Sequence, residues 1–318
     1  MTPPNLTPSS ADVLLFDIGR LRWDESLCKS FRVPLRALPE VRESHAHFGT
    51  TDVGGLLRKP VPIVGVMGDS QAALFAQRCY RPGTAKATFG TGTSVLLNIG
   101  GKLRIPTQGA VTALAWVRNG KPTYALEGII NFSAATIEWL KNQLGLIHNT
   151  DEVEQLAVSL KDNGGVYLIP AFAGLSAPHW APHARAAVVG MTAHTQRAHL
   201  VRAAQEAIAY QIRDVLAMMQ KSDGVRLKRL HADGGSTRNA FLMQFTADLT
   251  RTEIAVAEVA ESSAWGAALN GLLGLGYYQS LEELSALPCP AQSFQPQMKS
   301  READRLHAGW LAAVKRVL

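Results

Sequence analysis

Glycine-rich turns that follow apolar runs constrain the fold of this 318-residue chain more than any other feature. Residues 89–94 read FGTGTS between two predicted strands, and residues 233–239 read DGGSTRN between a predicted strand and a predicted helix. Glycine permits backbone conformations in which several N–H groups face an anion, and threonine hydroxyls supply further donors. Two such turns among mixed strands and helices predict an α/β fold with phosphate-binding loops.

Each loop also has a plainer interpretation. The turn at 89–94 could be an ordinary hairpin connection, and the one at 233–239 an ordinary strand–helix turn with Ser236 or Thr237 as helix cap. A functional role for the second loop rests on the helix N-terminus, whose unpaired N–H groups suit phosphate while the glycines leave room for a purine. A third candidate, FDIGR at 16–20, lacks a second alternating strand after it, and we treat it as a decoy.

Asp69 stands where a predicted apolar strand, 61–67 (VPIVGVM), meets a predicted helix that starts after Gly68. A carboxylate at such a junction can cap its own helix. It can equally accept the proton of a substrate hydroxyl. The residues alone leave both roles open.

Composition narrows the class of protein. Apolar residues make up 47% and charged residues 18%, which excludes a disordered chain. The net charge of +6 is scattered, without the basic stripe that nucleic-acid binding requires. Two uncharged windows, 164–182 and 262–280, are interrupted by prolines or by Asn270 and several glycines, so we predict no membrane association.

Cysteine usage and the N-terminus predict a cytoplasmic protein. Cys28, Cys79 and Cys289 are widely spaced and odd in number, which favours a reducing compartment over a disulfide framework. Residues 1–13 lack the basic region and the apolar run of a signal peptide. Histidines cluster between 179 and 199, but prolines there prevent a regular helix, so we predict no metal site.

Hydrophobic periodicity and turn residues predict the remaining elements. Strand patterns occupy 84–90, 94–100 and 227–232, and helix patterns occupy 129–144, 198–219, 262–275 and 299–318. The chain changes character after Pro82-Gly83, which places a domain boundary between residues 81 and 82.

Ten segments, in this order, resemble the FGGY family of carbohydrate kinases and within it the glycerol kinase branch. They are LLFDIGRLRWDESL, LPEV, PIVGVMGDSQAALFAQ, GTAKATFGTGTSVLLNIG, YALEGIINFSAATIEWL, YLIPAFAGLSAPHWAPHAR, VVGMTAHTQRAHLVRAAQEAIAYQ, LHADGGSTRNAFLMQFTADL, ESSAWGAALNGLLGLGYY and GWLAAVKRV. The GDSQAAL helix disfavours a third interpretation, a fragment of an actin-like ATPase or chaperone.

The resemblance implies two actin-like (ribonuclease H-like) domains that close on a cleft and transfer phosphate from ATP, with Mg²⁺, to a sugar or polyol. Asp69 matches the catalytic base, which deprotonates the attacking hydroxyl. Thr91 matches a threonine that contacts the nucleotide phosphates, and Gly235 and Asn239 match residues that contact the adenosine.

The chain departs from the glycerol kinase pattern at four positions. Ala134 and Glu138 stand where those kinases carry a nucleotide-contacting Gly and Gln, so these two contacts are not expected. Ser70 replaces a Gln beside the base, and Ser94 replaces a Phe beside the substrate. With Asp69, these serines are the expected substrate-binding residues, and they predict a larger and more polar pocket than one for glycerol.

The resemblance also implies that residues 1–81 are the C-terminal remnant of the N-terminal kinase domain, and that 82–318 are the whole C-terminal, nucleotide-binding domain. The family's phosphate hairpin lies outside this remnant. Because the apolar strand 61–67 would lack the sheet on which it packs in the family, we expect residues 1–60 to be poorly ordered alone or to pair with a second copy in a homodimer. Activity is expected to need a separate N-terminal kinase half. The alternative is a non-catalytic module that binds nucleotide or a partner chain.

Overall fold

The computed structural model describes residues 14–106, 109–224, 227–259 and 261–318. We predict no signal peptide in residues 1–13, and these residues lie outside the described ranges. No helix in the described ranges is long and apolar enough to cross a membrane.

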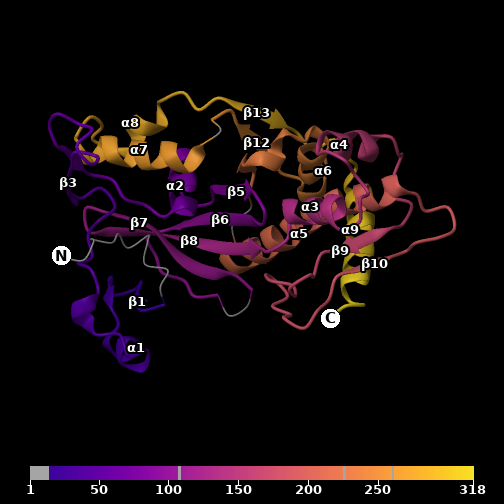
Figure 1. Ribbon diagram of the computed structural model, residues 1–318, viewed down its shortest axis with the longest axis horizontal. Helices are drawn as coiled ribbons and strands as arrows, with labels where there is room; N and C mark the ends of the chain where they lie inside the picture. The colour runs from indigo at the N-terminus through magenta and orange to yellow at the C-terminus, as the bar shows by residue number, and fades with distance from the viewer. Residues whose placement is uncertain (1–13, 107–108, 225–226, 260) are drawn as a thin grey trace.

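A seven-stranded sheet forms the centre of the molecule (Figure 1). Its strands, in spatial order, are β13 (Ala291–Phe294), β12 (Glu253–Ala257), β11 (Arg229–Asp233), β5 (Ala85–Phe89), β6 (Thr93–Gly100), β8 (Lys121–Ile130) and β7 (Val111–Arg118). The three strands β12, β11 and β5 are parallel, and every other neighbouring pair in this sheet is antiparallel. The predicted strands at 84–90, 94–100 and 227–232 are thus confirmed to within about two residues at their ends.

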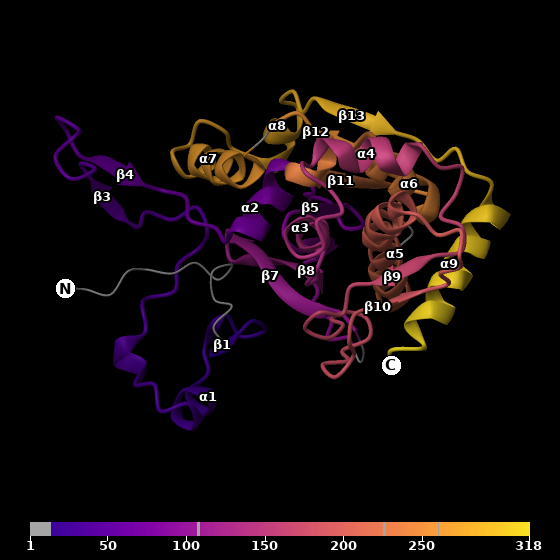
Figure 2. The same ribbon diagram turned by 45° about the vertical axis from the view of Figure 1, so that its right-hand side comes forward.

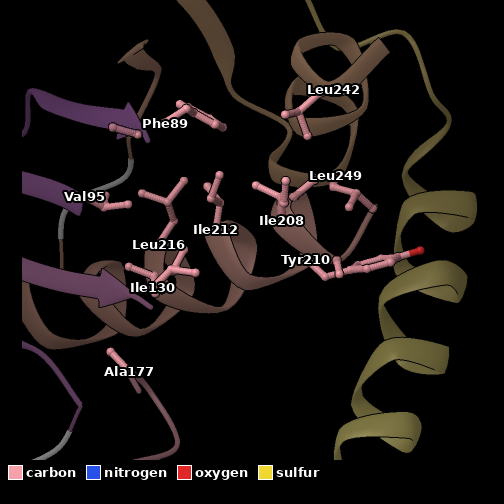
Figure 3. Packing of buried hydrophobic residues seen from close by; sticks show 14 of the residues in the cluster. Phe89, Val95, Ile130, Ala177, Ile208, Tyr210, Ile212, Leu216, Leu242 and Leu249 are labelled. Atoms are coloured by element: carbon pink, nitrogen blue, oxygen red, sulfur yellow. The ribbon is translucent and has the colours of Figure 1, made fainter. Parts of the chain in front are cut away.

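One face of the sheet is covered by the long helix α5 (Arg197–Asp223), with α6 (Ala240–Thr250) beside it. Figure 3 shows Ile212 and Leu216 of α5 on the side of the central strands, and Ile208 next to Leu249 of α6. This is the apolar face that the 198–219 pattern predicted. Beyond it lies α9 (Ser300–Val314), whose Trp310 ring stacks on Tyr210 of α5 with centroids 5.3 Å apart.

The other face of the sheet is covered by α2 (Asp69–Ala76) and α7 (Ser262–Gly274), with α8 (Leu281–Ser285) beside them. The two larger helices pack so closely that a Cβ at Gly266 would overlap the backbone of Ala72. The small residues of α7, which belong to the uncharged stretch 262–280, therefore allow close packing between two helices. This packing fixes where α2, and with it Asp69, lies over the sheet.

Smaller elements complete the C-terminal part. Helix α3 (Ala134–Asn142) follows β8, and α4 (Asp151–Val158) packs against α5. Strands β9 (Tyr167–Ile169) and β10 (Ala187–Val189) form an antiparallel pair beside α5 and α9. The helix predicted at 129–144 is wrong in its first turn, because the strand β8 continues to Ile130.

The N-terminal part extends away from this body (Figure 2). It contains β1 (Phe16–Asp17), β2 (Arg22–Trp23), α1 (Glu25–Ser30), a 3₁₀ turn (Leu35–Ala37), β3 (Gly49–Thr51) and β4 (Val61–Ile63). Strands β3 and β4 pair only with each other, and β1 pairs with β2.

Two predictions for this part were wrong. The strand at 61–67 stops at Ile63, because the segment after it lies against α7, where a Cβ at Gly65 would come within 2.7 Å of the Gly271 nitrogen. The residues after 16–20 do form a second strand, β2, although it is only two residues long. In that turn the Asp17 carboxylate accepts hydrogen bonds from the amides of Gly19 and Arg20, both at 2.9 Å.

Candidate active site

Two predicted loops meet at one edge of the sheet. Because β5 and β11 are parallel, the turn after Phe89 and the glycine pair after Asp233 leave the sheet at the same end. Gly234 has φ of +96°, and a Cβ there would come within 2.5 Å of the Phe89 carbonyl oxygen. Only glycine allows this approach, which holds the two loops against each other.

The turn that carries Thr91 is a hairpin connection between β5 and β6, as its plainer interpretation proposed. It also binds the start of α3, since the carbonyl of Thr91 accepts the amides of Ser133 at 2.9 Å and Ala135 at 3.1 Å. A Cβ at Gly92 would overlap the carbonyl of Ile130. The backbone is therefore fixed, while Thr91 lies exposed at the tip.

The loop after β11 continues as a 3₁₀ turn, Gly235–Arg238, before α6 begins. The helix is capped by Asn239, whose Oδ1 accepts the amide of Leu242 at 2.8 Å, so the prediction of a Ser236 or Thr237 cap was wrong. Gly235 is exposed, and a Cβ there would meet no atom within 4 Å. A side chain at this position would therefore extend into open space.

Asp69 is the first residue of α2, after Gly68 at the N-cap, and it is exposed. It therefore does not occupy the N-cap position that its plainer interpretation assumed. Its Oδ1 accepts the amide of Ser70 at 2.6 Å, and its carbonyl accepts the Ser263 hydroxyl of α7 at 2.9 Å. These contacts fix the start of the helix and leave the carboxylate at the surface.

The two predicted substrate-side serines lie next to each other. Ser70 on α2 and Ser94 on β6 have their hydroxyl oxygens 3.5 Å apart. Ser94 in turn donates to Oε1 of Glu127 on β8 at 3.2 Å. Sequence analysis missed Glu127, although a carboxylate inside the apolar strand pattern YALEGII was a signal that could have found it.

A fully buried lysine lies beneath α2 near these groups. Lys86 on β5 donates to Thr88 Oγ1 at 2.8 Å. Burial lowers the pKa of the Lys86 ammonium below its ordinary value, and three carboxylates oppose that effect, namely Asp233, Glu127 and Asp69. The sequence signal that was overlooked is a lysine at the centre of the predicted strand TAKATFG.

Asp233, the last residue of β11, is buried next to this lysine's strand. Its Oδ2 accepts the Gln77 side-chain amide of α2 at 3.4 Å, while its Oδ1 is buried without a hydrogen-bond partner in the described part of the chain. The edge thus combines hydroxyls, one buried lysine and several carboxylates, of which the exposed Asp69 can act as a base.

The other candidate positions lie apart from this set or contribute little to it. Ala134 begins α3 beside the Thr91 turn, whereas the exposed Glu138 side chain accepts Asn142 of its own helix at 3.3 Å. Among the described residues, no three His, Cys, Asp or Glu side chains form a group that could hold a metal ion. His179 instead lies 3.8 Å from Asp214 of α5.

Comparison with known proteins identifies the family. The sequence model of the C-terminal domain of the FGGY family of carbohydrate kinases matches residues 85–275, and that of the N-terminal domain matches residues 7–76. The chain belongs to the FGGY family of carbohydrate kinases. It has the α/β FGGY fold, with a fragment of the N-terminal domain and a C-terminal domain.

Within the FGGY family the chain is similar to glycerol kinases. It is 44% identical over 308 residues to the glycerol kinase of Shewanella sp. (strain ANA-3) and 42% identical over 310 residues to that of Klebsiella pneumoniae (strain 342). These matches cover 97% and 98% of this chain, and 62% of each relative. The chain therefore spans less than two thirds of the length of the curated relatives it matches.

Solved kinase structures are also similar to this chain. The crystal structure of Plasmodium falciparum glycerol kinase with ADP is similar with a TM-score of 0.91 and 34% identity, over 99% of this chain and 63% of that one. The crystal structure of a xylulose kinase from Rhodospirillum rubrum is similar with a TM-score of 0.83 and 22% identity, and the match covers 98% of this chain and 64% of that chain. That second likeness shows the fold alone.

Proposed function

We propose that this chain is the nucleotide-binding part of an ATP-dependent kinase that phosphorylates a hydroxyl of a sugar or polyol. The observation that carries the proposal is the meeting of the Thr91 turn and the Gly235 loop at one sheet edge, where Gly234 touches Phe89. The similarity to a glycerol kinase solved with ADP supports it. In this proposal Thr91 contacts phosphate, while Gly235 and Asn239 border the adenosine.

Phosphoryl transfer depends on position and charge more than on covalent chemistry by the protein. Asp69, exposed and held by the amide of Ser70, is the proposed base that accepts the proton of the attacking hydroxyl. We propose Mg²⁺ as the companion of ATP, where it would neutralise phosphate charge. Mg²⁺ takes oxygen ligands, mainly phosphates and one or two carboxylates, and Asp233 Oδ1, which is buried without a hydrogen-bond partner in the described part of the chain, is an oxygen of that type.

The acceptor is proposed to be longer than glycerol. Ser70 and Ser94, with hydroxyl oxygens 3.5 Å apart, line the substrate side together with Asp69. They leave more room than Gln and Phe would, and they can pair with additional substrate hydroxyls that would otherwise be buried at a cost. Assays of three- to six-carbon polyols and ketoses with the chain reconstituted with an N-terminal kinase half test this, and a clear preference for glycerol would refute it.

The division into a remnant, 1–81, and a nucleotide-binding domain, 82–318, remains part of the proposal. So do the cytoplasmic location and the need for a separate N-terminal kinase half. The second candidate function is a non-catalytic module that binds nucleotide or a partner chain.

Titration of the purified chain with ADP tests the nucleotide site. The chain should bind ADP weakly, and Gly235→Val should abolish binding without unfolding, because the added side chain enters open space that we assign to the purine. Gly271→Ala on α7 is the control, because its Cβ also meets no atom within 4 Å. Equal ADP affinity for the unaltered chain and Gly235→Val would remove the pocket assignment.

A further inference from the structure

Lys86 has no solvent exposure, and the proposed function gives it no role. A lysine is almost never fully buried unless its charge is matched, so its position requires an explanation. Its side chain follows β5 toward the Thr91 turn and donates to Thr88 Oγ1 at 2.8 Å. The ammonium therefore lies directly beside the Thr88 hydroxyl.

Strand register shows which groups share the sheet face of Thr88. Thr88 lies opposite Ser94 in the antiparallel pair with β6 and opposite Asp233 in the parallel pair with β11. Residues paired in this way point to the same side of a sheet. Ser94 contacts Ser70 of α2. Thr88, Ser94 and Asp233 therefore lie on the sheet face beneath the helix that begins at Asp69. Thr88 is itself half-buried, at the boundary between the core and the site.

The hydrogen bond with Lys86 determines whether the Thr88 hydroxyl donates or accepts toward a ligand. An ammonium only donates, so the Thr88 oxygen must accept, and its own proton is left for a different acceptor. An O–H group whose oxygen is bound to a cation is a stronger donor than an ordinary hydroxyl. Asp233, Glu127 and Asp69 lie close enough to Lys86 to favour its charged form, against the effect of burial.

We propose that Lys86 is a positioning residue that makes Thr88 a donor to the phosphate groups of the nucleotide at the Gly90–Thr93 turn. The proposal rests on the proposed function, because it assumes that a nucleotide binds at this edge. It adds a phosphate-contacting residue, Thr88, that the family resemblance did not supply, and a buried cation that acts through it. A purely structural Lys86, which only compensates Asp233, would not act through Thr88.

Calorimetric titration with ADP and with adenosine separates these cases. Thr88→Val should weaken ADP binding by about tenfold, the scale of one hydrogen bond to a charged group, and leave adenosine affinity unchanged. Thr88→Ser keeps the hydroxyl and should restore ADP affinity. Lys86→Met should show the same loss for ADP alone. Thr112→Val on β7, whose hydroxyl donates to the Arg104 carbonyl, is the matched strand control.

The outcomes are distinct. ADP affinity of Thr88→Val equal to that of the unaltered chain would overturn the inference and leave the proposed function in place. A parallel loss of ADP and adenosine binding would also overturn it, because that pattern indicates structural damage. No ADP binding by the unaltered chain would contradict the proposed function and this inference with it. Should Lys86→Met fail to fold, the comparison of Thr88→Val with Thr88→Ser decides the question.

Discussion

At the scale of single residues, buried polar groups were the least predictable feature of the chain. The sequence predicted Asp69, Ser70 and Ser94 as neighbours of a substrate, and two of them do lie in contact. It did not predict Lys86 or Glu127, because a charged residue in a strand pattern is normally assigned to the solvent side. Only the register of β5, β6 and β8 places these two on a covered face.

Asp214 of α5 illustrates how a buried carboxylate joins distant elements. Its Oδ1 is 2.6 Å from His307 Nε2, and its Oδ2 accepts Trp310 Nε1 at 2.7 Å, which ties α9 to α5. Burial alone would raise the pKa of this carboxyl, but the hydrogen bonds with His307 and Trp310, together with His179 at 3.8 Å, outweigh burial and lower the pKa below its ordinary value.

A lowered pKa in the folded state means that the Asp214 charge stabilises the fold above the ordinary carboxyl range, and that this stability is lost as the pH falls through the lowered pKa. We predict that Asp214→Asn reduces the free energy of unfolding by about 2 kcal/mol at neutral pH, because a buried paired charge is removed. The deficit should shrink at acidic pH. Urea titrations at several pH values measure it, and a deficit independent of pH would contradict the assignment.

At the scale of elements, the sequence predicted most of those that the C-terminal body uses. The strands β5 and β6 and the helices α5, α7 and α9 carry their own periodicity and turn residues. Two of the errors have one physical cause, which is that tertiary contacts end or extend an element. The strand after residue 60 ends early because Gly65 lies against α7, and β8 continues to Ile130 because β6 pairs with it there.

The packing of α2 on α7 gives a matched pair of glycine substitutions. Gly266→Ala should destabilise the protein by about 1–3 kcal/mol, because its Cβ would overlap the Ala72 backbone and push α2 away. Gly271→Ala lies on the same helix, where the Cβ meets no atom within 4 Å, and should be neutral or up to ~1 kcal/mol stabilising. Denaturant unfolding compares the two. Equal effects would show that α7 does not pack as described.

At the scale of the whole molecule, the N-terminal part differs from the body in how much apolar surface it exposes. Large apolar side chains that are at least 43% exposed include Leu14, Phe31, Leu35, Val53, Leu56 and Val61. The hairpin of β3 and β4 pairs with no strand of the central sheet. Exposed apolar surface of this extent is typical of a region that is covered by another chain or domain.

Limited proteolysis tests that difference. Trypsin should cleave after Arg58, an exposed residue between β3 and β4, well before it cleaves within the sheet and helices of residues 85–275. Sedimentation of the intact chain over a range of concentrations should show association through the same region, and the trimmed product should remain monomeric. Initial cleavage within 85–275 would contradict this order of stability.

The central claim is that this chain supplies the nucleotide site and the base of a sugar or polyol kinase, and ATP-dependent phosphorylation tests it most directly. The purified chain should be inactive alone and active when the N-terminal half of a glycerol kinase is added. Asp69→Asn should lower the restored rate by about 10²–10⁴-fold while ADP binding is kept, and Asp151→Asn on α4 should have no effect. Ordinary kinase rates without the added half, or equal restored rates for Asp69→Asn and the unaltered chain, would contradict the claim.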